Sequence, residues 1–242
     1  MGSKIIHLEK IIPLTEGSTD SIHYHVEFQF TELTDFHNKT ALELVKKELN
    51  KQFFNAEKLE FSSKPEENFE TLIAAITPAY REEGLKLKKE MEEMSYLLNY
   101  ELIKSSKIVY NKNNILVIEI ESYIFAGGAH GLGNMQYLHF DMNTGESFGL
   151  EEIFGTDAKQ KIATILIDKG EEMKNNGESL LFDDAKAELN DNFYFDKKKF
   201  FFVYNPYEIG PYSAGYITVE IPIEKVKSLI LKDGPLGFLS GK

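Results

Sequence analysis

Two long strand patterns joined by a turn signal restrict the fold more than any other feature of this chain. Residues 100–110 and 115–125 are rich in β-branched, leucine and tyrosine side chains, and they flank the segment Asn111-Lys112-Asn113-Asn114. Asparagine tolerates the positive φ angles that tight hairpin turns require. The pattern therefore predicts an antiparallel hairpin in the middle of the chain.

Other periodic segments extend this prediction to a mixed fold. Residues 22–30, IHYHVEFQF, alternate apolar and polar side chains, which is typical of a half-buried strand. Thr40 and Glu43 have the spacing of a capping box that opens a helix. Pro65 is expected to start a second helix, which Pro78 should kink or end. The remaining expected elements are a strand at 134–141, a helix from 156 to about 173, a hairpin at 193–204, a last strand at 215–221 and a short helix at 223–231.

We predict an α+β fold, with an N-terminal strand–helix unit packed with a mainly antiparallel sheet that carries one long helix. Composition shifts near residue 95, where helical patterns give way to strand patterns. The expected domains are therefore residues 1–95 and 96–242, a division that suits a chain of 242 residues.

Charge and cysteine content exclude several classes of function. The chain has 39 acidic and 27 basic residues, and its formal net charge is -12. A nucleic-acid binder needs a basic face to neutralise phosphates, so this class is not expected. A cationic partner is compatible with the negative net charge. There is no cysteine, which excludes disulfides, thiolate metal sites and a thiol nucleophile. We expect no cofactor.

The N-terminal sequence MGSKIIHLEK lacks the apolar core of a signal peptide. No apolar run approaches the ~20 residues that a membrane-spanning helix needs. We interpret Met1-Gly2-Ser3 as a cloning remnant. An export signal, and with it a possible lipid anchor, is therefore expected in the natural protein ahead of this sequence.

The glycine-rich segment Gly127-Gly128-Ala129-His130-Gly131 has three interpretations. A phosphate cradle is disfavoured, because the P-loop lysine and the spacing of dinucleotide-binding glycines are missing. A sharp turn between two strands explains the glycines, because they adopt positive φ freely. For His130, a structural role in the turn is favoured over ligand binding, and catalysis is the least favoured role, since no serine elbow or cysteine accompanies it.

A second candidate site is the loop Asn205–Gly215, with the sequence NPYEIGPYSAG. Its prolines and glycines predict a shaped rather than a floppy loop. Tyr207 and Tyr212 offer large amphipathic surfaces of the kind used in interfaces, and Glu208 could pair with His130 across the sheet. Core packing around a hydrogen-bonded glutamate is an equally good interpretation.

One strand face carries His23, His25 and Glu27, three residue types that bind metals. Neighbours on one face of a strand lie ~6.6 Å apart, so a metal could bridge two of them. No fourth ligand is indicated, and an exposed polar face is the favoured interpretation. No metal site is predicted.

Three segments together resemble a known family. They are YIFAGGAHGLGNMQYLHFDMNTGESFGLEEIF at 123–154, FYFDKKKFFFVYNPYEIGPYSAG at 193–215 and VEIPIEKVKSLI at 219–230. They are similar to the domain of unknown function in the RsiV-type anti-sigma-factor ectodomain, which often follows a PdaC-like domain. Shared motifs include GGAHG, the turn from Asp141 to Gly145 and the tyrosine-containing loop. The resemblance covers residues 96–242 well, and residues 20–95 resemble the PdaC-like partner by element order.

The resemblance implies an extracytoplasmic, α+β protein of the bacterial cell envelope, and in RsiV-type proteins it implies binding of lysozyme. We therefore favour a non-catalytic binding or sensing domain that binds a basic protein such as lysozyme. One alternative is an enzyme domain acting on cell-wall glycan with His130 and Glu208 as acid and base. Another is a structural, wall-associated lipoprotein. The sequence leaves the ligand and the oligomeric state open.

Overall fold

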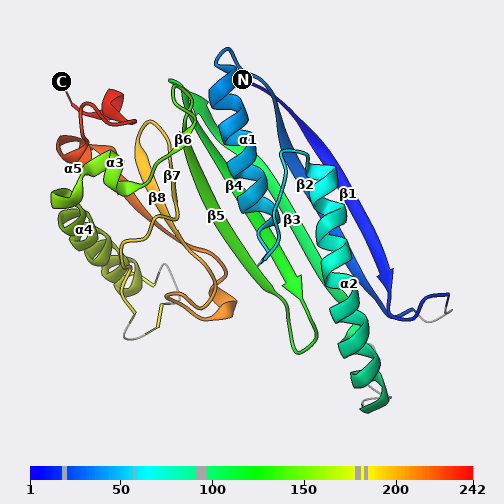
Figure 1. The fold of residues 1–242 in the computed structure, drawn as a ribbon. Coiled ribbons are helices and arrows are strands. Elements are labelled where there is room, and N and C mark those ends of the chain that lie inside the picture. Colours follow the sequence, from blue (N-terminus) through cyan, green and yellow to red (C-terminus); the bar gives the residue numbers. More distant parts are fainter. Residues whose placement is uncertain (18–20, 57, 91–96, 178–180, 183–184, 242) are drawn as a thin grey trace. The chain divides into compact units, whose positions relative to one another are not determined.

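The computed structural model describes the whole chain except residues 18–20, 57, 91–96, 178–180, 183–184 and 242 (Figure 1). The predicted α+β class is confirmed. Two compact units emerge, one formed by residues 1–107 and 120–133 and the other by residues 108–119 and 134–242. The domain boundary predicted at residue 95 lies outside the described residues.

The first unit combines sheet strands with two helices. Residues 113 and 114, at the turn between β3 and β4, have φ angles of 55° and 56°, which confirms the predicted hairpin and its asparagine turn. β1 and β2 are antiparallel, whereas β2 and β3 are parallel. The elements that contribute to this unit are β1 (Gly2–Pro13), β2 (His23–Asp35), α1 (Lys39–Phe54), α2 (Pro65–Glu90) and parts of β3 (Tyr100–Lys112) and β4 (Ile115–Phe125).

An aromatic cluster joins β2 to the helices that cover it. Val26 and Phe28 are fully buried, as the alternation of this strand predicted. The Phe28 ring lies 5.5 Å from Phe53 of α1 and 5.3 Å from Phe69 of α2. Burial of each such ring stabilises the unit by roughly 2–3 kcal/mol. Lys104 of β3 donates a 2.8 Å hydrogen bond to the Phe53 carbonyl near the end of α1, and burial lowers the pKa of this lysine to about 8.

The structure differs from the sequence-based expectations for this unit in three places. β1 was not predicted. The cap of α1 is Asn38, whose side chain accepts from the Ala41 N–H at 3.1 Å, so the helix starts before Thr40. Helix α2 continues through Pro78 to Glu90, so Pro78 does not end it as one of the two expectations had it, because packing of the apolar face of the helix outweighs one lost backbone hydrogen bond.

The second unit carries a three-stranded antiparallel sheet in the order β7-β8-β9 and the helix α4. Strands β1 to β6 follow one another in the six-stranded sheet, and β3, β4 and β5 contribute residues to both units. The elements of the second unit are β5 (Leu132–Asp141, from residue 134), β6 (Glu146–Ser147), α3 (Leu150–Phe154), α4 (Thr156–Asn175), β7 (Phe193–Phe195), β8 (Lys199–Tyr204), β9 (Ile217–Pro222) and α5 (Ile223–Val226).

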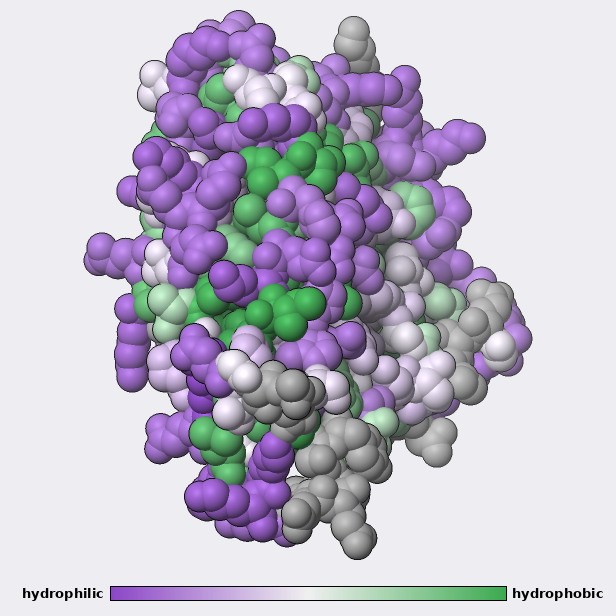
Figure 2. All heavy atoms as spheres, turned by 90° about the vertical axis from the view of Figure 1, so that its right-hand side faces the viewer, coloured by the Kyte–Doolittle hydropathy of each residue, from purple (hydrophilic) through white to green (hydrophobic). Residues whose placement is uncertain are grey.

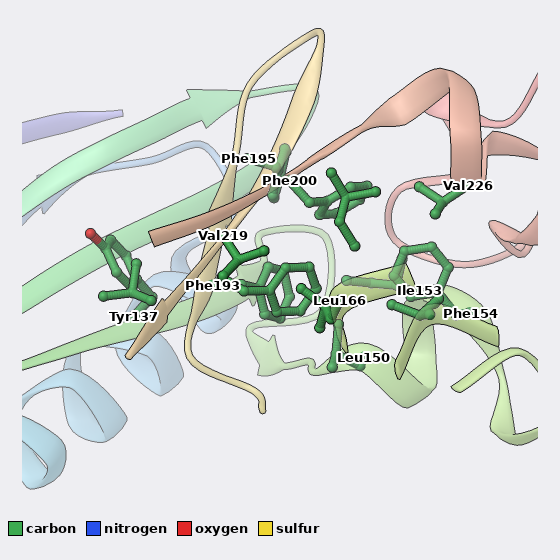
Figure 3. Packing of buried hydrophobic residues seen from close by; sticks show 14 of the residues in the cluster. Tyr137, Leu150, Ile153, Phe154, Leu166, Phe193, Phe195, Phe200, Val219 and Val226 are labelled. Carbon is green, nitrogen blue, oxygen red and sulfur yellow. The ribbon is translucent and has the colours of Figure 1, made fainter. Parts of the chain in front are cut away.

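The core of the second unit is aromatic and aliphatic (Figure 3). Phe193, Phe200 and Phe202 from the β7–β8 hairpin are almost completely buried. Asp196 shapes the hairpin turn, because its carboxylate accepts from the backbone N–H groups of Lys198 and Lys199. This hairpin was predicted from the aromatic segments on either side of the turn.

Among the described residues, no helix has the length and apolar character needed to cross a membrane.

Candidate functional site

The glycine-rich segment forms the turn between β4 and β5 in the first unit. Gly127 has φ of 83° and Gly128 has φ of 93°. A side chain would be strained at either position, since such angles favour glycine. A Cβ atom on Gly127 would also lie 3.1 Å from the carbonyl oxygen of Leu97. The backbone geometry and the close approach of Leu97 therefore both require glycine here.

His130 is exposed at the end of this turn. Its Nδ1 lies 2.9 Å from the carbonyl oxygen of Gly131, to which it donates a hydrogen bond. Gly131 itself packs under the Tyr123 ring, where a Cβ atom would lie 2.3 Å from Cζ. The imidazole thus contacts backbone of its own turn, an arrangement that helps to hold the turn.

The turn after β5 is organised by Asp141. Its carboxylate accepts from the backbone N–H of Asn143 at 2.8 Å, and its carbonyl accepts from the N–H of Gly145 at 2.7 Å. Gly145 has φ of 85°, which again suits glycine. The hydrogen bonds of Asp141 are therefore those of a turn residue.

The loop at residues 205–215, called the tyrosine loop below, is closed by one carboxylate. Glu208 accepts from the Asn205 backbone N–H at 2.8 Å and from its side-chain amide at 3.2 Å. The Asn205 carbonyl in turn accepts from the N–H of Glu208 at 3.0 Å. Hydrogen bonds to an ionised carboxylate are stronger than neutral ones, so Glu208 fixes the first half of the loop.

Two further contacts anchor the tyrosine loop to its unit. Asn205 accepts from the backbone N–H of Met135 in β5 at 2.7 Å. Ile209 is buried, and its carbonyl accepts from the N–H of Phe182 at 3.0 Å. The tip of the loop is therefore held between an anchored start and a buried isoleucine.

Tyr207 occupies an unusual position at this tip. Its φ is 74°, a value that costs a residue with a side chain on the order of 1–2 kcal/mol relative to ordinary backbone. Its side chain is nevertheless 52% exposed, so the strain gains little burial. The ring lies 6.0 Å from the ring of Tyr212, with 31° between their planes. Strained backbone of this kind concentrates at functional sites.

Negative charge accompanies the tyrosine pair. Burial raises the pKa of Tyr204, and the charges of Glu208 and Glu188 raise it further. The Tyr204 hydroxyl donates to the Glu188 carbonyl at 2.7 Å. Glu208 is exposed and lies next to Tyr207 in the chain. Aromatic faces together with carboxylates form a surface that attracts cations.

The structure brings Tyr207, Glu208 and Tyr212 together in one loop of the second unit. His130 belongs to the first unit, and its pairing with Glu208, including an acid–base role for the two, stays a prediction. Sequence reasoning missed the anchoring role of Asn205, although an asparagine before a proline is a turn signal.

The His23, His25 and Glu27 row is paired across strands. His25 Nε2 lies 3.0 Å from a carboxylate oxygen of Glu9, and His7 Nε2 lies 3.1 Å from one of Glu27. Both partners come from β1, the strand that was not predicted. Within the described part of the chain, no three histidine or acidic side chains are grouped so that they could hold a metal ion.

Comparison with known families identifies two regions in this α+β chain. Residues 18–133 match the family described as "Deacetylase PdaC", and residues 151–224 match the family described as "Protein of unknown function (DUF3298)". The chain therefore has a region similar to PdaC followed by a region similar to DUF3298, which confirms the inferred order of a PdaC-like part and a part of unknown function. These matches suggest an extracytoplasmic cell-envelope domain of unknown function. No curated protein matches the chain.

Two solved structures share the fold. One is a DUF3298 family member from Bacteroides fragilis, 20% identical, with a TM-score of 0.85 over 100% of this chain and 98% of the other. The second is a DUF3298 family protein from Pseudomonas aeruginosa, 13% identical, with a TM-score of 0.65 over 95% of this chain and 94% of the other. At these identities the likeness shows the fold alone.

Proposed function

We propose that the protein is a non-catalytic, extracytoplasmic binding or sensing domain of a bacterial cell-envelope protein, and that the tyrosine loop is its binding surface. The observation that carries this proposal is Tyr207, an exposed ring on strained backbone. The backbone conformation does not call for tyrosine, because glycine or asparagine would adopt φ of 74° at lower cost. A ring retained there at a cost in stability points to a contact with a partner.

The chemistry of the loop favours a cationic group as its ligand. A lysine or arginine side chain over a tyrosine face gains on the order of 0.5–2 kcal/mol, more as water is excluded. The adjacent carboxylate of Glu208 adds attraction without having to move, because Asn205 already holds it. Tyrosine is also among the residues that most often supply interface anchors.

A basic protein of the lysozyme class is the proposed partner. The resemblance to the RsiV-type ectodomain supplies this candidate, and the net charge of -12 would steer a basic protein toward the domain. The family matches are compatible with a location where such a partner occurs. Long-range steering weakens as salt rises, whereas a desolvated contact at the tyrosine loop persists.

The test is a calorimetric titration of the protein with lysozyme at ~0.15 M salt, where charges beyond ~8 Å are screened. Wild type is compared with Tyr207→Asn, which keeps a residue suited to positive φ. We expect a saturable complex, and a loss of affinity of at least ~10-fold in the variant, equivalent to ~1.4 kcal/mol.

Phe238→Asn is the matched control, since Phe238 is 46% exposed in the same unit but lies outside the loop. This substitution should leave the affinity within ~2-fold of wild type. Absence of a complex at tens of micromolar protein would remove lysozyme as the partner. A complex that Tyr207→Asn does not weaken would remove the tyrosine loop as its binding surface.

A further inference from the structure

Strand β1 is the edge of the six-stranded sheet, and no other strand of the described chain lies beyond it (Figure 1). It is 12 residues long, and Ile12 is its only buried residue. An edge strand presents a row of backbone N–H and C=O groups that can pair with a strand from another chain. Natural sheets usually shorten, bend, cover or charge such edges. β1 carries Lys4, Glu9 and Lys10, but it keeps its full length and two exposed isoleucines, Ile5 and Ile11, and this combination requires an explanation.

The two faces of β1 differ in their side chains. Ile6 lies opposite Phe30 and Leu8 opposite Phe28, so the even-numbered residues share the face that the helices cover. Figure 2, which views the side where β1 lies, shows apolar atoms among hydrophilic ones. Ile5 and Ile11 are each 59% exposed, the highest value for a large apolar residue in the described chain. The outer face carries, in alternation, Ile5, His7, Glu9 and Ile11.

We propose that this edge pairs with β1 of a second copy of the chain, antiparallel and about a two-fold axis at Leu8. In this register Ile5 lies opposite Ile11 of the other copy, and His7 lies opposite Glu9. Each of these pairs occurs twice because of the two-fold axis, as in any isologous dimer. Apolar pairs and hydrogen-bonded polar pairs directly across strands both stabilise a sheet.

The neighbouring registers lack this complementarity. Residues that lie opposite each other must point to the same face of the sheet. The two-fold axis therefore passes through a residue of β1 and never between two residues. An axis at His7 would set Lys4 opposite Lys10, and an axis at Glu9 would set two copies of Glu9 opposite each other. Like charges directly opposite destabilise a strand pair. Of these three registers, only the one about Leu8 sets no like charges opposite each other, although it also places Lys4 opposite Ile12 and Lys10 opposite Ile6.

Existing contacts within one chain orient the residues for this pairing. His7 contacts Glu27 at 3.1 Å and Glu9 contacts His25 at 3.0 Å, both across β1 and β2. Pairing about Leu8 would continue these contacts into a row that runs from Glu27 through His7 to Glu9 and His25 of the second copy. The proposal concerns self-association and is independent of the tyrosine loop.

A mixing experiment tests the partner and the register together. His7→Glu places a carboxylate opposite Glu9 of an identical copy, and Glu9→Lys places an ammonium opposite His7. Each variant alone should therefore dimerise at least ~10-fold more weakly than wild type in sedimentation velocity. An equimolar mixture should recover the dimer, because the new charges then face each other. Circular dichroism and thermal unfolding establish that both variants are folded.

A cysteine scan provides a second readout, because the chain contains no cysteine of its own. Only the residue on the two-fold axis faces its own copy, so Leu8→Cys should form a disulfide-linked dimer on mild oxidation. Lys10→Cys, on the same face, should not. Ile103→Lys is a control on β3, where an isoleucine is 37% exposed away from the edge, and it should leave dimerisation unchanged.

Three results would overturn the proposal. The first is a wild-type chain that stays monomeric at ~0.1 mM, a weak limit for a specific dimer. The second is a mixture of the two charge variants that associates no better than either alone. The third is crosslinking through Lys10→Cys rather than Leu8→Cys, which would place the contact in another register.

Discussion

The GGAHG turn and the tyrosine loop both bend the chain through positive φ, but they assign that geometry to different residue types. In the turn, Gly127 and Gly128 have φ of 83° and 93°, which glycine adopts freely. In the tyrosine loop, Tyr207 has φ of 74° and keeps an exposed ring. The geometry of the turn thus suits its glycines, whereas the loop keeps a tyrosine at an angle that glycine or asparagine would adopt at lower cost.

The two units also differ in the environment of a histidine, which is exposed in the first unit and buried in the second. His130 is an exposed residue that contacts its own turn. His139 is 4% exposed in β5, where its ring stacks 4.1 Å from Phe193 and its Nε2 lies 2.8 Å from the Phe193 carbonyl. Burial lowers the pKa of His139 to about 4, although the hydrogen bond to Phe193 opposes the shift. No pattern in the sequence singles out His139.

The largest predicted effect is acid destabilisation through His139. Its folded pKa of about 4 lies below the ordinary value of 6.5, so the unfolded chain binds the proton more tightly. The contribution of this residue is complete above pH 6.5 and is lost as the pH falls toward 4. The free energy of unfolding should decrease by roughly 3 kcal/mol over this range from His139 alone.

Urea unfolding at pH 7, 6, 5 and 4 measures this loss. His139→Gln is less stable than wild type at pH 7, because it loses the stacking on Phe193. Its stability should nevertheless fall less steeply with acid. Parallel pH profiles for the two proteins would show that His139 is not the buried base described above.

The second prediction concerns the glycines of the turn. Gly127→Ala should destabilise the protein by about 2 kcal/mol, because the methyl group combines positive φ with a contact 3.1 Å from the Leu97 carbonyl. Gly128→Ala should cost about 1 kcal/mol, since nothing lies within 4 Å of its Cβ position. Thermal or urea unfolding gives both values. Equal losses would mean that backbone conformation, and not the approach of Leu97, decides the turn.

The elements that were predicted correctly depend on short-range information. The β3–β4 hairpin follows from two asparagines that accept positive φ, and the β7–β8 hairpin follows from Asp196 between aromatic segments. β1 was missed because Ile5, Ile6, Ile11 and Ile12 interrupt its alternation. At an edge, exposure of both faces weakens the pattern that marks a half-buried strand.

The candidate site could be predicted in part, because its residue types form a local sequence pattern. Tyrosines and prolines in one loop indicate a shaped, exposed surface, so Tyr207, Glu208 and Tyr212 could be selected from sequence. The positive φ of Tyr207 depends on where Asn205 and Ile209 are fixed, and Asn205 is fixed by Met135, a residue 70 positions away in the chain. Long-range contacts of this kind leave no local pattern.

The third prediction separates the contribution of the Glu208 carboxylate, which closes the tyrosine loop, from that of the Tyr207 ring. Glu208→Gln keeps the shape of the side chain but removes the charge that strengthens its bonds to Asn205. We expect a loss of about 1 kcal/mol in the free energy of unfolding, limited by the exposure of the loop. Urea unfolding at pH 7 provides the measurement. An unchanged stability would mean that Met135 and Ile209 hold the loop without the carboxylate.

The smallest predicted effect is a gain in stability rather than a loss. It tests the comparison between the tyrosine loop and the GGAHG turn most directly. Tyr207→Asn replaces a strained tyrosine by a residue that tolerates positive φ, and the ring it removes is half exposed. The variant should therefore be more stable than wild type by about 0.5 kcal/mol, a gain of the size seen when backbone strain is relieved. Urea unfolding of Tyr207→Asn beside Tyr207→Ala separates backbone relief from simple loss of the ring, since alanine does not favour positive φ. If both variants lose stability equally, the ring packs as part of the fold, and the loop then resembles the glycine turn in serving structure alone.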